Sequence, residues 1–204
     1  MDLLEKLNDA QKNAVIHTNG PLLVLAGPGS GKTRVITHRI AYLISNGVPS
    51  DRILALTFTN KAAGEMLNRV EKLIGQRCSA WISTFHSFCA RILRRECAAI
   101  DYNSDFLIYD IDDQKQAIKH VLKSINTETF LKPEEFLYTI SNYKNKCITP
   151  DQIEITGKRD KQIVEVYKAY QKFLYKSNAF DFDDLLLKTL EIFANYKHVT
   201  KYFQ

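Results

Sequence analysis

The sequence AGPGSGKT, residues 26–33, constrains the fold of this chain more than any other feature. It follows a short apolar run (PLLVLA, residues 21–26) and precedes a helical pattern that begins at Lys32. Glycines at such a turn let backbone N–H groups converge on an anion, and the start of the next helix adds the positive end of its dipole. A lysine here can reach the β and γ phosphates of a nucleotide, while the hydroxyl of Thr33 can ligate Mg²⁺. We therefore predict a phosphate-binding loop (P-loop) for ATP and Mg²⁺, the alternative being a glycine-rich turn with an incidental Lys-Thr pair.

The residues predicted to hold the nucleotide phosphates form one continuous stretch of the chain. They are Ala26, Gly27, Pro28, Gly29, Ser30, Gly31, Lys32 and Thr33. Lys32 and Thr33 are also the predicted catalytic residues, and Thr33 is the predicted metal ligand. The first position departs from the strict motif, which has a glycine where this chain has Ala26.

The first 90 residues alternate short apolar runs with helical patterns. Strands are predicted at 21–26, 53–58 and 80–85, and helices at 32–45, at 60–74 and from about Ser87. This alternation is typical of a parallel sheet with right-handed crossovers. We predict an α/β fold of the P-loop NTPase type.

The pattern changes after about residue 95. Helices are predicted at 112–125, 133–145, 160–176 and from Asp181, with one strand-like run at 106–109 and a capping box with proline at Thr149. Tyr167 and Tyr170 have the helical spacing of core residues. These patterns predict a mostly helical insertion within the α/β domain.

Composition excludes several classes of protein. The 204 residues are 45% hydrophobic and 25% charged, which excludes a disordered chain, and the net charge of +5 permits an anionic partner without requiring one. No apolar stretch approaches the roughly 18 residues of a membrane span, so we expect a cytoplasmic protein. The four cysteines, expected to be reduced core residues, are Cys78, Cys89, Cys97 and Cys147.

Two acidic positions have alternative interpretations. Asp110 ends a strand-like run, where a P-loop protein places the acid that holds Mg²⁺, but with Asp113 it also fits a helix cap. Asp181 begins the sequence DFDD, which fits either a metal site or an N-cap with acids in the first turn. The cap is the favoured interpretation at both positions.

Four further segments accompany the P-loop in a specific order. The order LNDAQKNAV, AGPGSGKT, LTFTNKAA, STFHSF and FDFDDLL resembles superfamily 1A DNA helicases of the UvrD/Rep/PcrA type, over essentially the whole chain. The resemblance implies a RecA-like domain 1A interrupted by a helical subdomain 1B. Its implied bounds are 1–95 for the first part of domain 1A, 96–180 for subdomain 1B and 181–204 for the return to domain 1A.

The resemblance also implies roles for single residues. Gln11 matches the glutamine that reads adenine, although it also fits the third position of a capping box, and Arg34 matches a residue near the base or phosphates. The residues implied to contact single-stranded DNA are Phe58, Thr59, Asn60, Lys61, Thr84, Phe85 and His86. Taken singly, these fit other roles: Phe58 a core residue, Thr59 and Asn60 a helix cap, and His86 a turn residue.

Helicases of this family place a DExxQ motif shortly after the FDFDDLL helix, and this chain has none. The resemblance therefore implies an N-terminal portion of an ATP-dependent 3′→5′ DNA helicase, truncated before that motif and inactive alone. A related helicase–nuclease subunit fits the same motifs. Two other classes remain open: a small P-loop kinase with Asp110 as its metal ligand, and a non-catalytic binding module.

Overall fold

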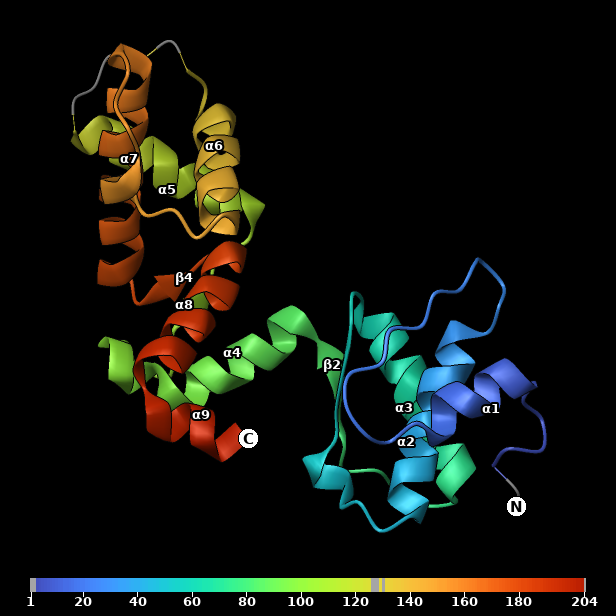
Figure 1. Cartoon of the computed structure of the whole chain (residues 1–204). Coiled ribbons are helices and arrows are strands. Elements are labelled where there is room, and N and C mark those ends of the chain that lie inside the picture. The colour runs from blue at the N-terminus through green and yellow to red at the C-terminus, as the bar shows by residue number, and fades with distance from the viewer. Residues whose placement is uncertain (1–2, 126–128, 130, 204) are drawn as a thin grey trace. The chain divides into compact units, whose positions relative to one another are not determined.

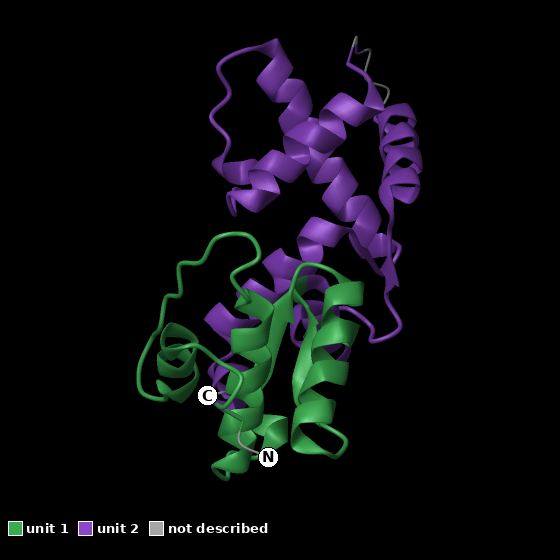
Figure 2. Cartoon of the chain, turned by 90° about the vertical axis from the view of Figure 1, so that its right-hand side faces the viewer, with its two compact units in different colours: residues 1–85 green, residues 86–204 purple. Residues whose placement is uncertain are grey.

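The computed structural model describes residues 3–125, 129 and 131–203. The chain divides into two compact units, residues 1–85 and residues 86–204 (Figure 2). The structure is a mixed α/β protein in which helices predominate and the strands are short and parallel.

The first unit contains three helices and a two-stranded sheet among its described residues (Figure 1). Its elements are α1 (Asp9–Ile16), α2 (Lys32–Ser45), a 3₁₀ turn (Ser50–Arg52), β1 (Leu54–Thr57), α3 (Asn60–Ile74) and β2 (Trp81–Thr84). The strands β1 and β2 are parallel and in register from Leu54 opposite Trp81 to Thr57 opposite Thr84. The two carboxyl ends of the strands therefore lie next to each other.

The predicted bounds of α2 and α3 are confirmed. Thr59 caps α3 because its Oγ1 accepts a hydrogen bond from the Ala62 N–H at 3.1 Å, and Gly75 ends the helix in the left-handed conformation with φ of +71°. The buried side chains of Ile40 on α2 and Met66 and Val70 on α3 belong to one hydrophobic core.

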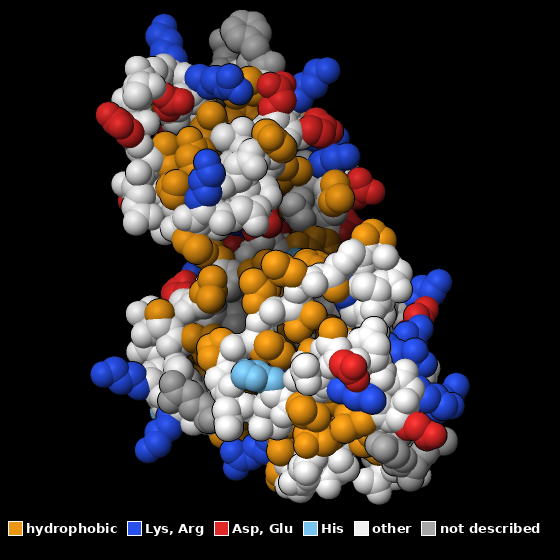
Figure 3. Space-filling view, turned by 45° about the vertical axis from the view of Figure 1, so that its right-hand side comes forward, with side chains coloured by type: hydrophobic (Ala, Val, Ile, Leu, Met, Phe, Trp, Pro, Cys, Tyr) orange, Lys and Arg blue, Asp and Glu red, His pale blue; other side chains and the backbone are white. Residues whose placement is uncertain are grey.

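The predicted strand at 21–26 is wrong for this structure. The segment has no regular secondary structure, and Leu23 and Leu25 are 81% and 86% exposed. A strand is held by ladder hydrogen bonds to a neighbour, and β1 and β2 pair with each other rather than with this segment. An apolar run indicates that a segment prefers burial, but it does not supply the neighbouring strand. Hydrophobic side chains reach the surface across the face drawn in Figure 3.

The second unit is mostly helical. Its elements are α4 (Phe85–Glu96, beginning at the last residue of the first unit), a 3₁₀ turn (Cys97–Ile100), β3 (Leu107–Ile108), α5 (Ile111–Ser124), α6 (Pro133–Asn145), a 3₁₀ turn (Pro150–Gln152), α7 (Lys158–Lys176), β4 (Ala179–Phe180), α8 (Phe182–Asn195) and α9 (Lys197–Phe203). The four predicted helices are confirmed within about two residues at each end. Strand β4 was not predicted, because two residues are too few for a recognisable pattern; it pairs in parallel with β3.

Two hydrophobic cores hold this unit together. One lies among α5, α6 and α7 and contains the fully buried rings of Tyr167 and Tyr170, which confirms their prediction as core residues. The other lies among α4, α8 and α9 and includes Phe106 and Phe180. No helix in the described part of the chain is long and apolar enough to cross a membrane.

The four cysteines carry free thiols, as predicted. Cys89 and Cys97 are buried and Cys78 is half-buried. The prediction of a core position is wrong for Cys147, which is exposed just after α6 with φ of +55°.

A buried ionic cluster joins α6 to α8. The Nζ of Lys144 lies 2.6 Å from Oδ2 of Asp181 and 2.8 Å from Oδ1 of Asp184, and the Tyr170 hydroxyl donates to Asp181 at 3.1 Å. All three charged side chains are almost fully buried. Burial raises the pKa of Asp184 to about 6, although the Lys144 ammonium opposes this. Burial lowers the pKa of Lys144, but the facing carboxylates outweigh that effect and raise it overall.

The raised pKa of Asp184 gives a prediction for the pH dependence of stability. The native state binds a proton at this site between about pH 4 and pH 6, where the unfolded state has lost it. The protonated Asp184 therefore makes its full contribution to the free energy of unfolding below about pH 4. This contribution is lost as the pH rises through about 6, which lowers the free energy of unfolding by roughly 1–3 kcal/mol. Urea unfolding of the chain and of Asp184→Asn across this range measures the difference. Parallel pH profiles for the two proteins would contradict the prediction.

Candidate functional site

The glycine-rich loop ends at the first residue of α2. Gly29 and Gly31 have φ of +74° and +86°, a left-handed conformation that other residues adopt only with strain. Gly31 is the N-cap of α2, and Lys32 is the first residue of the helix. The backbone thus makes the sharp turn into a helix start that the motif predicts, although no strand precedes it.

Lys32 is folded back into this loop. Its Nζ donates to the carbonyl oxygens of Gly27 at 2.7 Å and of Ala26 at 3.1 Å. The Ser30 hydroxyl also donates to the Gly27 carbonyl, at 2.6 Å. An anionic phosphate would be a stronger partner for this ammonium group than a neutral carbonyl.

Gln11 lies against the same loop. Its Nε2 donates to the Ser30 carbonyl at 3.0 Å. Its Oε1 accepts from the Asn8 N–H at 3.2 Å, and its N–H donates to Oδ1 of Asn8 at 2.9 Å, which completes a capping box at the start of α1. The cap interpretation is therefore confirmed. The adenine-reading role stays a prediction, and the contact with Ser30 brings the side-chain amide to the loop where that role would need it.

Gln11 also lies close to Gly31. A Cβ built on Gly31 would lie 2.8 Å from Nε2 of Gln11, nearer than ordinary contact allows. We expect Gly31→Ala to destabilise the first unit by about 1–3 kcal/mol, chiefly because a residue other than glycine is strained at φ of +86°, with a smaller part from displacing the flexible end of Gln11. Urea unfolding measures the loss. The double variant Gly31→Ala/Gln11→Ala should recover the part due to the contact, and equal stability of Gly31→Ala and the unchanged chain would contradict the expectation.

The residues predicted to contact DNA gather at the carboxyl ends of β1 and β2. Phe58 follows β1 and is 93% exposed, so the core interpretation is wrong. Its ring centroid lies 6.2 Å from that of Phe85, which follows β2. Thr84 is the last residue of β2 and is buried, whereas Thr59 is the N-cap of α3. Two aromatic rings are thus held side by side at one edge of the sheet, where ligands of open α/β sheets bind.

Three other predicted DNA contacts lie in first turns of helices. Asn60 and Lys61 open α3, and both are exposed. His86 lies in the first turn of α4 and belongs to the second unit, where its ring packs edge-on against Phe182 with centroids 5.8 Å apart.

The two acidic alternatives are both resolved as helix caps. Oδ1 of Asp110 accepts from the N–H groups of Asp112 and Asp113, each at 2.9 Å, at the start of α5. Asp181 caps α8 by accepting from the Asp184 N–H at 2.8 Å. Within the described residues, no group of three or more His, Cys, Asp or Glu side chains is placed to hold a metal ion. The cap interpretation is therefore confirmed for Asp110 and for Asp181.

Arg34 lies in the first turn of α2 and is exposed. It lines a hollow of about 310 Å³ with side chains from α2 and α3. The others are Thr37, His38, Arg69, Lys72 and Leu73. This basic hollow beside the loop was not predicted, since its residues come from two helices and form no sequence motif.

Comparison with known proteins identifies the family of the chain. A family model described as the UvrD/REP helicase N-terminal domain matches residues 7–204. The ATP-dependent DNA helicases PcrA of Staphylococcus aureus and of Staphylococcus epidermidis are each 47% identical to the chain over 207 aligned residues. These alignments cover 99% of the chain and 28% of each relative, so the chain spans little more than a quarter of their length. The chain belongs to the UvrD/REP helicase N-terminal domain family.

Proposed function

We propose that the chain is the ATP- and single-stranded-DNA-binding N-terminal portion of an ATP-dependent 3′→5′ DNA helicase. The observation that carries this proposal is the loop at α2, where Lys32 folds over two carbonyls and Gln11 lies against Ser30. Membership of the helicase family and the name ATP-dependent DNA helicase of its relatives support it. In this proposal residues 1–95 and 181–204 belong to a RecA-like domain 1A, and residues 96–180 form subdomain 1B.

The residues of the loop fit a nucleoside triphosphate. Gly29 and Gly31 have left-handed φ values and carry no side chain into the loop, and a Cβ at Gly31 would lie close to Gln11. Lys32 would bind the β and γ phosphates, while the exposed Thr33 would contribute a hydroxyl oxygen to Mg²⁺, which binds chiefly to phosphate oxygens and water. When bound, Mg²⁺·ATP would supply the phosphoanhydride bond whose hydrolysis drives a helicase.

Each residue around the loop has a distinct task in this proposal. Gln11 would exchange its Ser30 contact for the adenine edge, which an amide can recognise by one donated and one accepted hydrogen bond. Arg34, in the first turn of α2, would lie beside the base or the phosphates.

DNA would bind at the carboxyl ends of β1 and β2. Phe58 and Phe85 offer exposed rings on which bases can stack without sequence preference. Thr59, Asn60 and Lys61 would hold phosphates by a hydroxyl, an amide and an ammonium group, which fixes the strand without reading its sequence. His86, in the second unit, is also proposed as a DNA contact. The buried Thr84 would keep the two strand ends in register.

Phe58→Ala tests this DNA-binding edge. We expect it to weaken binding of a labelled oligothymidylate by about 1–3 kcal/mol in fluorescence anisotropy, because one stacking ring is removed. Thermal stability should stay unchanged, since the side chain is 93% exposed. Tyr138→Ala is the matched control, an exposed aromatic on α6 that should not alter affinity. Equal affinity of Phe58→Ala and the unchanged chain would refute a DNA contact at this ring.

A further inference from the structure

We infer that the hollow between α5 and α7 in the second unit is a nucleotide-binding pocket, separate from the P-loop and from the strand ends. The ligand chemistry is a nucleobase that carries a phosphate, as a free mononucleotide or as one nucleotide of a single strand. The hollow has a volume of about 580 Å³ and lies wholly within residues 109–173 of that unit. It does not depend on the function proposed above.

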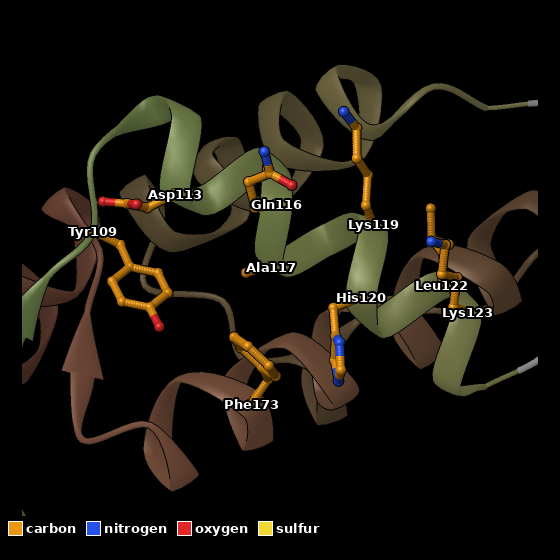
Figure 4. A pocket seen from close by; sticks show the side chains of 9 residues that line it. All are labelled: Tyr109, Asp113, Gln116, Ala117, Lys119, His120, Leu122, Lys123 and Phe173. Atoms are coloured by element: carbon orange, nitrogen blue, oxygen red, sulfur yellow. The ribbon is translucent and has the colours of Figure 1, made fainter.

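Aromatic rings form the walls of this pocket. Tyr109, Phe173 and His120 surround the space beneath Ala117 on α5 (Figure 4). The His120 and Phe173 ring centroids lie 5.1 Å apart at an angle of 44°. A flat heteroaromatic base can stack on such rings, whereas an aliphatic ligand would gain only the burial of apolar surface against them.

The walls are held in place before any ligand binds. The N–H of Tyr109 donates to the Phe180 carbonyl at 2.9 Å, and the Tyr109 carbonyl accepts from Nε2 of Gln114 at 3.1 Å. Phe173 packs against the core among α5, α6 and α7. Fixed walls reduce the conformational entropy that a ligand must overcome on binding.

Charge divides the pocket into two ends. Lys119 and Lys123 lie one turn apart on α5, and within the described residues neither forms an ion pair. The carboxylate of Asp113 lies at the other end, about 9–15 Å along the helix, where its Oδ2 accepts from the Asp110 N–H at 3.2 Å. In Figure 4 the Lys119 side chain points away from the three rings, so the phosphate of a bound nucleotide would lie at the rim of the pocket beside the lysines while its base lies by the rings. A bare phosphate would leave the rings unused.

An NMR titration of the ¹⁵N-labelled chain carrying Lys32→Ala tests the pocket with the P-loop disabled. We expect deoxyadenosine monophosphate to shift the backbone amides of residues 113–123 and 173. Adenosine, which lacks the phosphate, should bind about tenfold more weakly. Deoxythymidine decamer added in place of the mononucleotide distinguishes the sources: tighter binding at the same amides indicates a strand, and binding of the mononucleotide alone indicates a free nucleotide. Either result supports the pocket.

Two charge-reversed double variants test whether nucleotide binding depends on the lysines of α5. Lys119→Glu/Lys123→Glu should weaken mononucleotide binding about tenfold or more at low salt. Lys158→Glu/Lys161→Glu makes the same change of charge in the first turn of α7, about 18 Å along the helix from Phe173, and should alter binding less than about twofold. His120→Ala, which removes a wall and leaves both lysines, should also weaken binding. No shift at α5 up to about 10 mM ligand, or equal loss in the two double variants, would overturn the inference.

Discussion

Lys144→Met is expected to destabilise the second unit by about 3–5 kcal/mol, the largest loss among the substitutions considered. The reason is that two carboxylates, Asp181 and Asp184, would stay buried without their counter-charge. Deleting one partner of a buried ionic cluster leaves an uncompensated charge, and the carboxylates must then take up protons or the helices must separate. Urea unfolding at pH 7.5 measures the loss.

Two companion variants identify the cause. Lys146→Met changes an exposed lysine two residues away and should alter stability by less than about 0.5 kcal/mol. Lys144→Met combined with Asp181→Asn and Asp184→Asn removes every charge of the cluster and should recover part of the loss. If Lys144→Met were as stable as Lys146→Met, the ionic cluster would contribute nothing to the packing of α6 against α8.

Lys32→Ala is expected to weaken Mg²⁺·ATP binding to the chain by about 100-fold or more. The lysine is the cation that the loop already holds against the Gly27 carbonyl, and its loss removes a charge-assisted hydrogen bond to phosphate. Saturating ATP should raise the melting temperature of the unchanged chain by roughly 5–10 °C at 100 times its dissociation constant, and should leave that of the variant unchanged. We expect this binding without hydrolysis.

The control for this experiment removes a lysine of similar exposure from the proposed DNA edge. Lys61→Ala loses the same charge in the first turn of α3 and should keep the full thermal shift with ATP. Equal shifts for the chain and Lys32→Ala would contradict the assignment of the loop.

Local signals in the sequence are sufficient to predict the bounds of most helices. Helix α3 could be predicted to the residue because Thr59 caps it, an apolar stripe runs along it and Gly75 ends it. The same signals define α2 and the cap at Asp110. The segment 21–26 carried an equally strong apolar signal, yet forms no strand, because a strand depends on a partner elsewhere in the chain.

The ionic cluster was missed although its signals were present. Lys144 continues the spacing of Phe136 and Ile140, four residues apart, so it lies on the buried face of α6. The acids of the DFDD sequence were explained as a helix cap, and that explanation is right but incomplete. Only the three-dimensional structure shows that a lysine 37 residues earlier compensates them.

In the candidate site, too, the sequence predicts the features that depend on local signals and misses those that depend on contacts between distant residues. Loop residues 26–33 could be found from a motif whose glycines have a conformational cause, and the exposed pair Phe58 and Phe85 follows from the parallel register of two strands. The contact between Gln11 and Ser30 spans 19 residues and follows from no periodic pattern. The pocket at α5 combines residues of α5 and α7 with Tyr109, which follows β3, and likewise has no sequence signature.

The most direct measurement of the proposed function is unwinding by a chimaera in which this chain replaces the matching part of the Staphylococcus aureus PcrA helicase. We expect the chimaera to unwind a duplex with a 3′ single-stranded tail when ATP is present, and the same chimaera with Lys32→Ala to bind the tail but not to unwind. A chimaera that melts cooperatively and binds DNA, yet neither hydrolyses ATP nor unwinds, would contradict the assignment of this chain as the nucleotide- and DNA-binding portion of a helicase.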